Sequence, residues 1–325
     1  MSSYAVYKEH VEAHLSSVGN SSRWRRGKLL RPEYEAYCEK IGKIPDEFTP
    51  EELREMLLER DDVIQKIQWS DLTTAFRAYY NYLIEIGVWH DTNPCSNNMF
   101  KQEMFEQYIS ERKDVVFYYS PEQINKICDS IIDNRAFNEA IIRSIYEGVA
   151  SSLKELVNIR KTDPAVNEMS WRLKQVYLGL AAEDYYYTSN GRKVAEYIYV
   201  DNRLLPTKSK SPDITYVDDE QYAEYALKSA SKAIGVTSKA LGFTIDLNKV
   251  YLSGIVYRFI DKIGGPEELC NIILKDRHAV RKGNKEDIDK ITNILKELGY
   301  KSPTKSFIFD VKLFAMQLQN KMSTE

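Results

Sequence analysis

The stretch Phe76-Arg-Ala-Tyr-Tyr-Asn-Tyr-Leu-Ile-Glu-Ile-Gly-Val-Trp-His-Asp-Thr-Asn-Pro94 is the most informative segment of this 325-residue chain. It completes a pattern over residues 70–86 in which large apolar side chains recur at helical spacing, at Leu72, Phe76, Tyr79, Tyr80 and Leu83. Gly87 predicts the end of this helix, and Asn93-Pro94 predicts a turn after it. The stretch therefore predicts an aromatic-rich helix within a helical N-terminal domain.

Most of the remaining sequence also predicts helices. Thr49 can cap a helix over residues 50–60, and Ser120 can cap another that begins at Pro121. Further helices are expected over residues 124–132 and 138–148, and again from Asp219 onward. In that last region the sequence predicts helix breaks at Gly235, Gly242, Gly264-Gly265 and Gly299.

One region, residues 176–205, predicts β-structure because it is rich in tyrosine and valine, and Ser189-Asn190-Gly191 predicts a hairpin turn inside it. The expected fold is therefore mainly α with a small β-sheet. Residues 1–110 are predicted to form a helical domain that ends in a polar linker or linker helix, and residues 111–325 a second, mostly helical domain.

The composition indicates a soluble protein of the cytoplasm. Charged residues make up 29% of the chain and the mean hydropathy is −0.47. Neither a signal peptide nor an apolar run near the roughly 20 residues of a membrane helix is expected. The four separated cysteines, Cys38, Cys95, Cys128 and Cys270, predict free thiols. His10 and His14 have metal-ligand spacing but lack a third ligand, so they predict a solvated helix face, with no metal and no cofactor.

Positive charge is concentrated in two segments, although the net charge is −3. Residues 19–31 contain five basic residues and no acid, and residues 275–285 contain five basic residues and one acid. Because phosphates respond to the local potential more than to the total charge, both segments are candidates for contact with nucleic acid.

Four segments, taken in order, resemble motifs of the tyrosine recombinase (phage integrase) family. The opening stretch is similar to the last helix of that family's core-binding domain, and Tyr118-Tyr-Ser-Pro-Glu-Gln-Ile-Asn-Lys126 resembles the start of its catalytic domain. Residues 148–163 resemble the first catalytic box, and residues 252–274 resemble the second, with Gly264 at the family glycine. The resemblance covers about residues 50–290 and implies a two-domain, C-shaped clamp around duplex DNA.

The departures from the family are as informative as the matches. The family cleaves DNA with a tyrosine nucleophile, and two arginines, histidine or tryptophan, and a lysine assist the reaction. At the arginine, histidine and tyrosine positions this chain has Ser152, Val250, Ser253, Asp276 and Lys285, and Gly254 replaces a further histidine. Only the lysine of the β-hairpin has a counterpart, as Arg192 or Lys193. Since the loss of one transition-state donor already costs about 10²–10³-fold in rate, the resemblance implies a protein that is not an enzyme.

The residues expected to contact DNA are basic and lie in both predicted domains. They are Arg23, Arg25, Arg26, Lys28, Arg77, Lys154, Arg192, Lys193, Lys249, Arg281, Lys282 and Lys285. The expected function is sequence-specific binding of double-stranded operator DNA in the cytoplasm, at the nucleoid. The resemblance implies a transcriptional repressor that keeps a prophage in lysogeny.

Two other classes of function remain open. The chain could be an active or accessory recombinase that acts on phage DNA with relocated residues, or a helical protein-interaction module that no longer contacts DNA. Self-association or a regulatory protein partner is compatible with each class, whereas a membrane is not an expected partner.

Overall fold

The computed structural model describes residues 3–19, 22–58, 66–112, 115–132, 134–183, 185–187, 193–198, 202–208, 219–274 and 285–324. The chain divides into two compact units, Met1–Val115 (unit 1) and Val116–Glu325 (unit 2). The structure is mainly helical, which confirms that part of the prediction.

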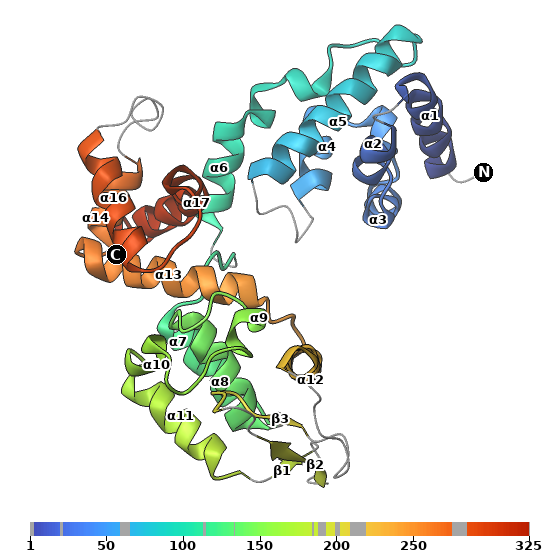
Figure 1. The fold of residues 1–325 in the computed structure, drawn as a ribbon. Coiled ribbons are helices and arrows are strands. Elements are labelled where there is room, and N and C mark those ends of the chain that lie inside the picture. Colours follow the sequence, from blue (N-terminus) through green and yellow to red (C-terminus); the bar gives the residue numbers. More distant parts are fainter. Residues whose placement is uncertain are drawn as a thin grey trace. The chain divides into compact units, whose positions relative to one another are not determined.

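Unit 1 is built from helices that pack around one long central helix, α5 (Figure 1). Its helices are α1 (Ser3–Ser17), α2 (Ser22–Leu29), α3 (Pro32–Ile41), α4 (Pro50–Leu58), α5 (Lys66–Glu85) and α6 (Gln102–Glu111). Short 3₁₀ turns cover Pro45–Glu47, Pro94–Ser96 and Asn98–Phe100. The apolar stripe predicted for α5 is confirmed, because Leu72, Phe76, Tyr79, Tyr80 and Leu83 are all buried.

The ends of the unit 1 helices follow local sequence signals. Gly87 has a φ of 73° after α5, and the Asn93 side chain accepts a hydrogen bond of 3.0 Å from the Cys95 amide in the turn that follows. The Thr49 hydroxyl accepts a hydrogen bond of 3.3 Å from the Glu52 amide and caps α4 as predicted. α6 lies where a linker or linker helix was expected, and it belongs to unit 1, since its Phe105 stacks on Trp69 of α5 with ring centroids 4.9 Å apart.

The interior of unit 1 contains a polar cluster that the sequence did not predict. Asp46 is buried and lies 2.6 Å from Nδ1 of His10, and it accepts a hydrogen bond of 2.5 Å from the Tyr79 hydroxyl. Burial raises the pKa of Asp46, and the two hydrogen bonds oppose that rise. The prediction that His10 and His14 form a solvated face is wrong, because His14 is 2% exposed and packs against Tyr79 and Tyr82.

Unit 2 contains several helices that pack against one of them, α8 (Figure 1). Its helices are α7 (Pro121–Asp129), α8 (Arg135–Tyr146), α9 (Leu153–Leu156), α10 (Pro164–Asn167), α11 (Trp171–Ala181), α12 (Asp219–Leu241), α13 (Leu247–Ile263), α14 (Pro266–Leu274), α16 (Lys285–Glu297) and α17 (Thr304–Met322). α7 starts with the predicted cap, in which the Ser120 hydroxyl accepts a hydrogen bond of 3.2 Å from the Gln123 amide.

Three short strands form an antiparallel arrangement in the order β1 (Tyr185–Tyr187), β2 (Lys193–Ile198) and β3 (Thr207–Lys208). The predicted turn at Ser189-Asn190-Gly191 lies outside the described residues. The prediction of β-structure from Val176 was wrong over residues 176–181, which belong to α11, because Leu173 and Leu180 bury a helical face there. The helix break predicted at Gly235 was also wrong, since α12 continues to Leu241 and Gly242 then takes a φ of 74°.

α13 joins two hydrophobic clusters of unit 2. Its first half packs with α8 through Val250, and its second half packs through Ile255 and Phe259 against the cluster that contains residues of α14 and α17. Both Gly264 and Gly265 have positive φ and end the helix, as predicted. α13 therefore carries Val250, Ser253 and Gly254, the positions that the resemblance matches to catalytic residues.

Candidate functional site

Two of the exposed basic residues among the predicted DNA contacts lie on α2. Arg23 and Arg26 are exposed, and Trp24 between them is 41% exposed. Arg26 forms an ion pair with Glu12 of α1, whereas Arg23 has no partner among the described residues. Cationic and aromatic groups on one short helix can contact phosphates and the faces of bases.

The other two basic residues of α2 turn toward the body of unit 1. Arg25 is half-buried, and its Nε atom has no hydrogen-bond partner within the described part of the chain. Burial, and after it the positive charge of Arg25, lower the pKa of His14 to about 4. Lys28 is also half-buried and pairs with Asp71 at 3.3 Å. Arg23 and Arg26 are therefore exposed to solvent, whereas Arg25 and Lys28 are half-buried.

Arg77 lies exposed on α5 and has a structural partner. Its Nη2 atom donates a hydrogen bond of 3.1 Å to the carbonyl of Cys95, in the turn that follows the helix. The Asn93 side chain links the same turn to α5, because it donates a hydrogen bond of 2.8 Å to the carbonyl of Arg77. Arg77 therefore holds this turn on α5, in addition to any contact it makes outside the protein.

In unit 2, the first-box positions form the start of a short helix. The Ser152 hydroxyl accepts a hydrogen bond of 3.3 Å from the Glu155 amide and caps α9. Ser151 donates two hydrogen bonds to the Glu155 carboxylate, of 2.8 Å from its amide and 2.6 Å from its hydroxyl. Lys154 is exposed on this helix. Ser152 thus has a local structural role where the family has an arginine.

The second-box positions lie inside the protein. Val250 and Ser253 are both 0% exposed. The Ser253 hydroxyl accepts a hydrogen bond of 2.8 Å from the Tyr119 amide and donates one of 2.6 Å to the Lys249 carbonyl. Side chains in these positions support the packing of α13 and are not available to a phosphate.

Lys249 combines a basic side chain with internal contacts. Its ammonium group donates a hydrogen bond to the carbonyl of Val116 and lies 4.7 Å from the centre of the Tyr119 ring. The residue is half-buried, and burial lowers its pKa. Lys249 therefore tethers the start of unit 2 to α13, a role that the sequence did not indicate.

Several predicted site residues fall outside what the structure describes. These are Asp276, Arg281 and Lys282 of the second basic segment, Arg192 of the β-hairpin, and the side chains of Lys193 and Lys285. Among the described residues, the exposed basic residues of α2 and Lys154 lie on separate units, and each belongs to its own local surface.

The structure also contains arginines that are buried or partly buried, which the sequence did not indicate. Arg143 is 5% exposed and pairs with Glu139 at 2.6 Å, and Arg258 lies partly buried on α13. The only signal in the sequence was an arginine within an apolar helical pattern, such as Ile-Ile-Arg143-Ser-Ile. Such a pattern does not separate a buried arginine from one whose charged end reaches solvent.

A metal centre is not evident in the described parts of the chain, where no three His, Cys, Asp or Glu side chains come together. Cys38, Cys95, Cys128 and Cys270 are free and buried, which confirms the expectation of free thiols. Among the helices described, none is long and apolar enough to cross a membrane. No protein-family model matches the chain, and the search of curated proteins finds no match.

Proposed function

We propose that this protein binds specific sites on double-stranded DNA without cleaving them, and that it represses transcription by occupying those sites. The proposal rests on the resemblance of four sequence segments to tyrosine recombinases, together with the loss of the residues that perform their chemistry. The observation that carries it is the burial of Val250 and Ser253, at 0% exposure each, where the resemblance places catalytic side chains. A phosphate cannot reach groups that are enclosed in a hydrophobic core.

The exposed basic and aromatic residues of α2 supply one surface for the proposed contact. Phosphate contacts by Arg23 and Arg26 would position the protein on the duplex, and Trp24 can pack against sugar or base faces. Specific occupancy requires an affinity for the site about 10³–10⁷-fold higher than for random DNA. This difference must come from base contacts and DNA shape. Maintenance of prophage lysogeny is the role that the resemblance suggests for such a repressor.

The proposal is tested by combining a binding assay with a cleavage assay. A genome-wide map of bound DNA should give discrete sites, and a reporter driven by a promoter with such a site should be repressed. A suicide substrate, a duplex of the same site with a nick, should form no covalent adduct. An adduct through a tyrosine would instead support the alternative of an active recombinase.

One observation favours protein contact as a second candidate function. Trp171 and Leu178 of α11 are 76% and 63% exposed, and their spacing of seven residues places them on one face of the helix. Self-association through this face would pair DNA-binding units on one operator. Sedimentation equilibrium of the wild type and of Trp171→Glu tests it, because only the wild type should associate.

A further inference from the structure

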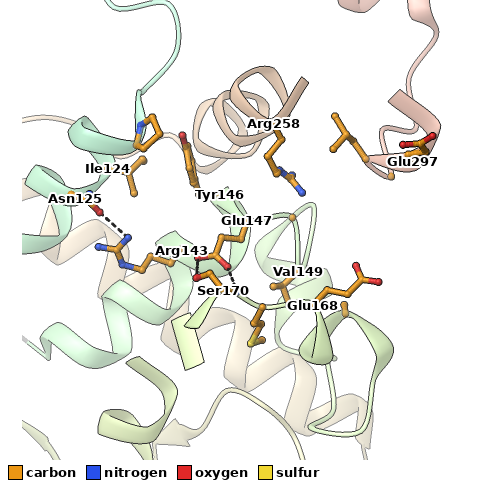
Figure 2. Close-up of a pocket in the computed structure, with 16 residues that line it drawn as sticks. Ile124, Asn125, Arg143, Tyr146, Glu147, Val149, Glu168, Ser170, Arg258 and Glu297 are labelled. Atoms are coloured by element: carbon orange, nitrogen blue, oxygen red, sulfur yellow. Dashed lines mark hydrogen bonds between the residues drawn. The ribbon is translucent and has the colours of Figure 1, made fainter. Parts of the chain in front are cut away.

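A cavity of about 550 Å³ lies in unit 2, between the end of α8, α13 and the turns at Gly148 and Gly299 (Figure 2). This volume is in the range of sites that hold drug-sized ligands. The apolar residues of its wall are Pro121, Ile124, Val149, Ala165, Met169 and Leu298. Ser152, Val250, Ser253 and Gly254, the described positions matched to recombinase catalysis, do not line this cavity.

Arg258 supplies a positive charge to this cavity. Figure 2 shows its side chain extending from α13 toward the loop that contains Val149. The Nε atom donates a hydrogen bond of 3.1 Å to the Gly254 carbonyl. The Nη2 atom is buried and has no hydrogen-bond partner among the described residues. Gly148 makes room for the guanidinium group, since a Cβ there would lie 2.5 Å from Nη2. The Glu147 carboxylate attracts this guanidinium electrostatically but forms no hydrogen bond with its Nη2 atom, and a buried donor without a hydrogen-bond partner is unfavourable.

Most other charges that line the cavity have partners. Arg143 pairs with Glu139 at 2.6 Å, and Glu297 pairs with Lys262 at 2.7 Å. The Glu147 carboxylate accepts hydrogen bonds of 2.9 and 2.7 Å from the amide and hydroxyl of Ser170. Glu168 is exposed at the rim. The nearby glutamates disfavour a ligand with several negative charges, whereas Arg258 favours one with a single negative charge.

We propose that this cavity binds a small monocarboxylate with an apolar body. The carboxylate pairs with the guanidinium group of Arg258, through charge-assisted hydrogen bonds. The body of the ligand lies on the wall formed by residues such as Ile124, Val149 and Met169. This binding does not depend on the proposed DNA-binding function, and it is measured on the full chain without DNA.

The test compares two ligands of the same shape, 4-phenylbutyrate and its neutral amide 4-phenylbutanamide, by isothermal titration calorimetry and ligand-observed NMR. The acid should bind once per chain with a dissociation constant of about 1 mM or below. The amide should bind at least about tenfold more weakly, because it cannot pair with a guanidinium charge. Equal binding of acid and amide, or no binding of the acid up to about 10 mM, would overturn the proposal.

Two variants and one control locate the site. Arg258→Gln should remove the preference for the acid over the amide. Ala165→Phe keeps Arg258 but narrows the cavity, and it should weaken the binding of both ligands. Lys228→Gln removes an equivalent charge from an exposed position on α12 and should change neither ligand's affinity. A preference for the acid that persists in Arg258→Gln would place the anion elsewhere and refute the assignment.

Discussion

Gly254 of α13 lies against the backbone carbonyl of Tyr146 at the end of α8, so closely that a Cβ at position 254 would fall 1.7 Å from the carbonyl oxygen. This contact brings the two central helices of unit 2 together at a point where no side chain fits. The family resemblance assigns a histidine to this position. The close packing of α8 and α13 therefore has no room for that catalytic side chain.

Gly254→Ala should destabilise unit 2. The added methyl group meets backbone, which cannot move aside as a flexible side chain would, so α8 and α13 must separate. We expect the free energy of unfolding to fall by at least about 3 kcal/mol, the upper part of the range for overpacked cores. Urea unfolding followed by far-UV circular dichroism measures it.

Gly235→Ala is the matched control, because Gly235 is also inside a helix but has no atom within 4 Å of its added Cβ. It should raise the free energy of unfolding by about 0.5–1 kcal/mol, through the better helix propensity of alanine. Equal effects of the two substitutions would show that α8 and α13 are not in such close contact.

Ser253→Ala should also destabilise unit 2, for a different reason. The substitution leaves the Tyr119 amide without the acceptor that the fully buried Ser253 hydroxyl supplies. A buried donor without a partner costs about 1–3 kcal/mol. Ser130→Ala removes an exposed hydroxyl that donates to the Lys126 carbonyl, and it should change stability by less than about 0.5 kcal/mol. A Ser253→Ala protein as stable as the Ser130→Ala protein would contradict the buried hydrogen bond.

His14 should make the stability of unit 1 depend on pH. Its folded-state pKa of about 4 lies below the 6.5 of an unperturbed histidine, so the unfolded chain takes up a proton first as the pH falls. The stability from neutral His14 is complete above pH 6.5 and decreases between pH 6.5 and about 4. The slope is at most about 1.4 kcal/mol per pH unit, the value for one proton.

Tryptophan fluorescence can follow this transition, because Trp24, Trp69 and Trp89 lie in unit 1. His14→Gln should have a flatter dependence of stability on pH than the wild type over pH 4–6.5. The exposed His90 provides the control, and His90→Gln should leave the dependence unchanged. Asp46 contributes with the opposite sign, since its pKa is raised, but it is present in all three proteins. Identical pH profiles for wild type and His14→Gln would refute the role of His14.

The features that the sequence predicted well are determined by a few neighbouring residues. Thr49, the Ser120-Pro121 pair and Gly87 define helix ends through hydrogen bonds or φ angles within one turn, so their effect can be read locally. The buried stripe of α5 follows from its 3.6-residue period. These signals need no knowledge of the tertiary structure.

The features that the sequence did not predict depend on distant contacts. His14 is buried because α1 packs on α5, and Lys249 is engaged because Val116 lies beside α13. Residues 176–181 form a helix although valine and tyrosine favour strands, because that helix packs against α8. The two units also place the basic residues on separate local surfaces, which the order of residues along the chain does not specify.

The exposed arginines of α2 should account for part of the salt dependence of DNA binding. Each phosphate contact releases counterions, so log K falls with log salt by about 0.9 per contact. Arg23→Gln together with Arg26→Gln should therefore weaken binding to all sequences and reduce the slope by about one unit per lost contact. Arg23 has the larger expected effect, because it has no ion-pair partner among the described residues, whereas Arg26 must first leave Glu12.

Lys8→Gln is the control for this last prediction, since Lys8 is an exposed lysine of the same unit whose charge is paired with Glu35 at 3.1 Å. Filter-binding titrations between about 50 and 200 mM salt give the slope for each protein. Lys8→Gln should keep the wild-type slope. If the double variant keeps it too, α2 does not contact phosphate, and the DNA-binding surface must lie on other residues, such as those around Lys154 of α9. If all proteins bind without any salt dependence, contact with a DNA backbone is itself refuted, and protein contact through Trp171 and Leu178 becomes the favoured function.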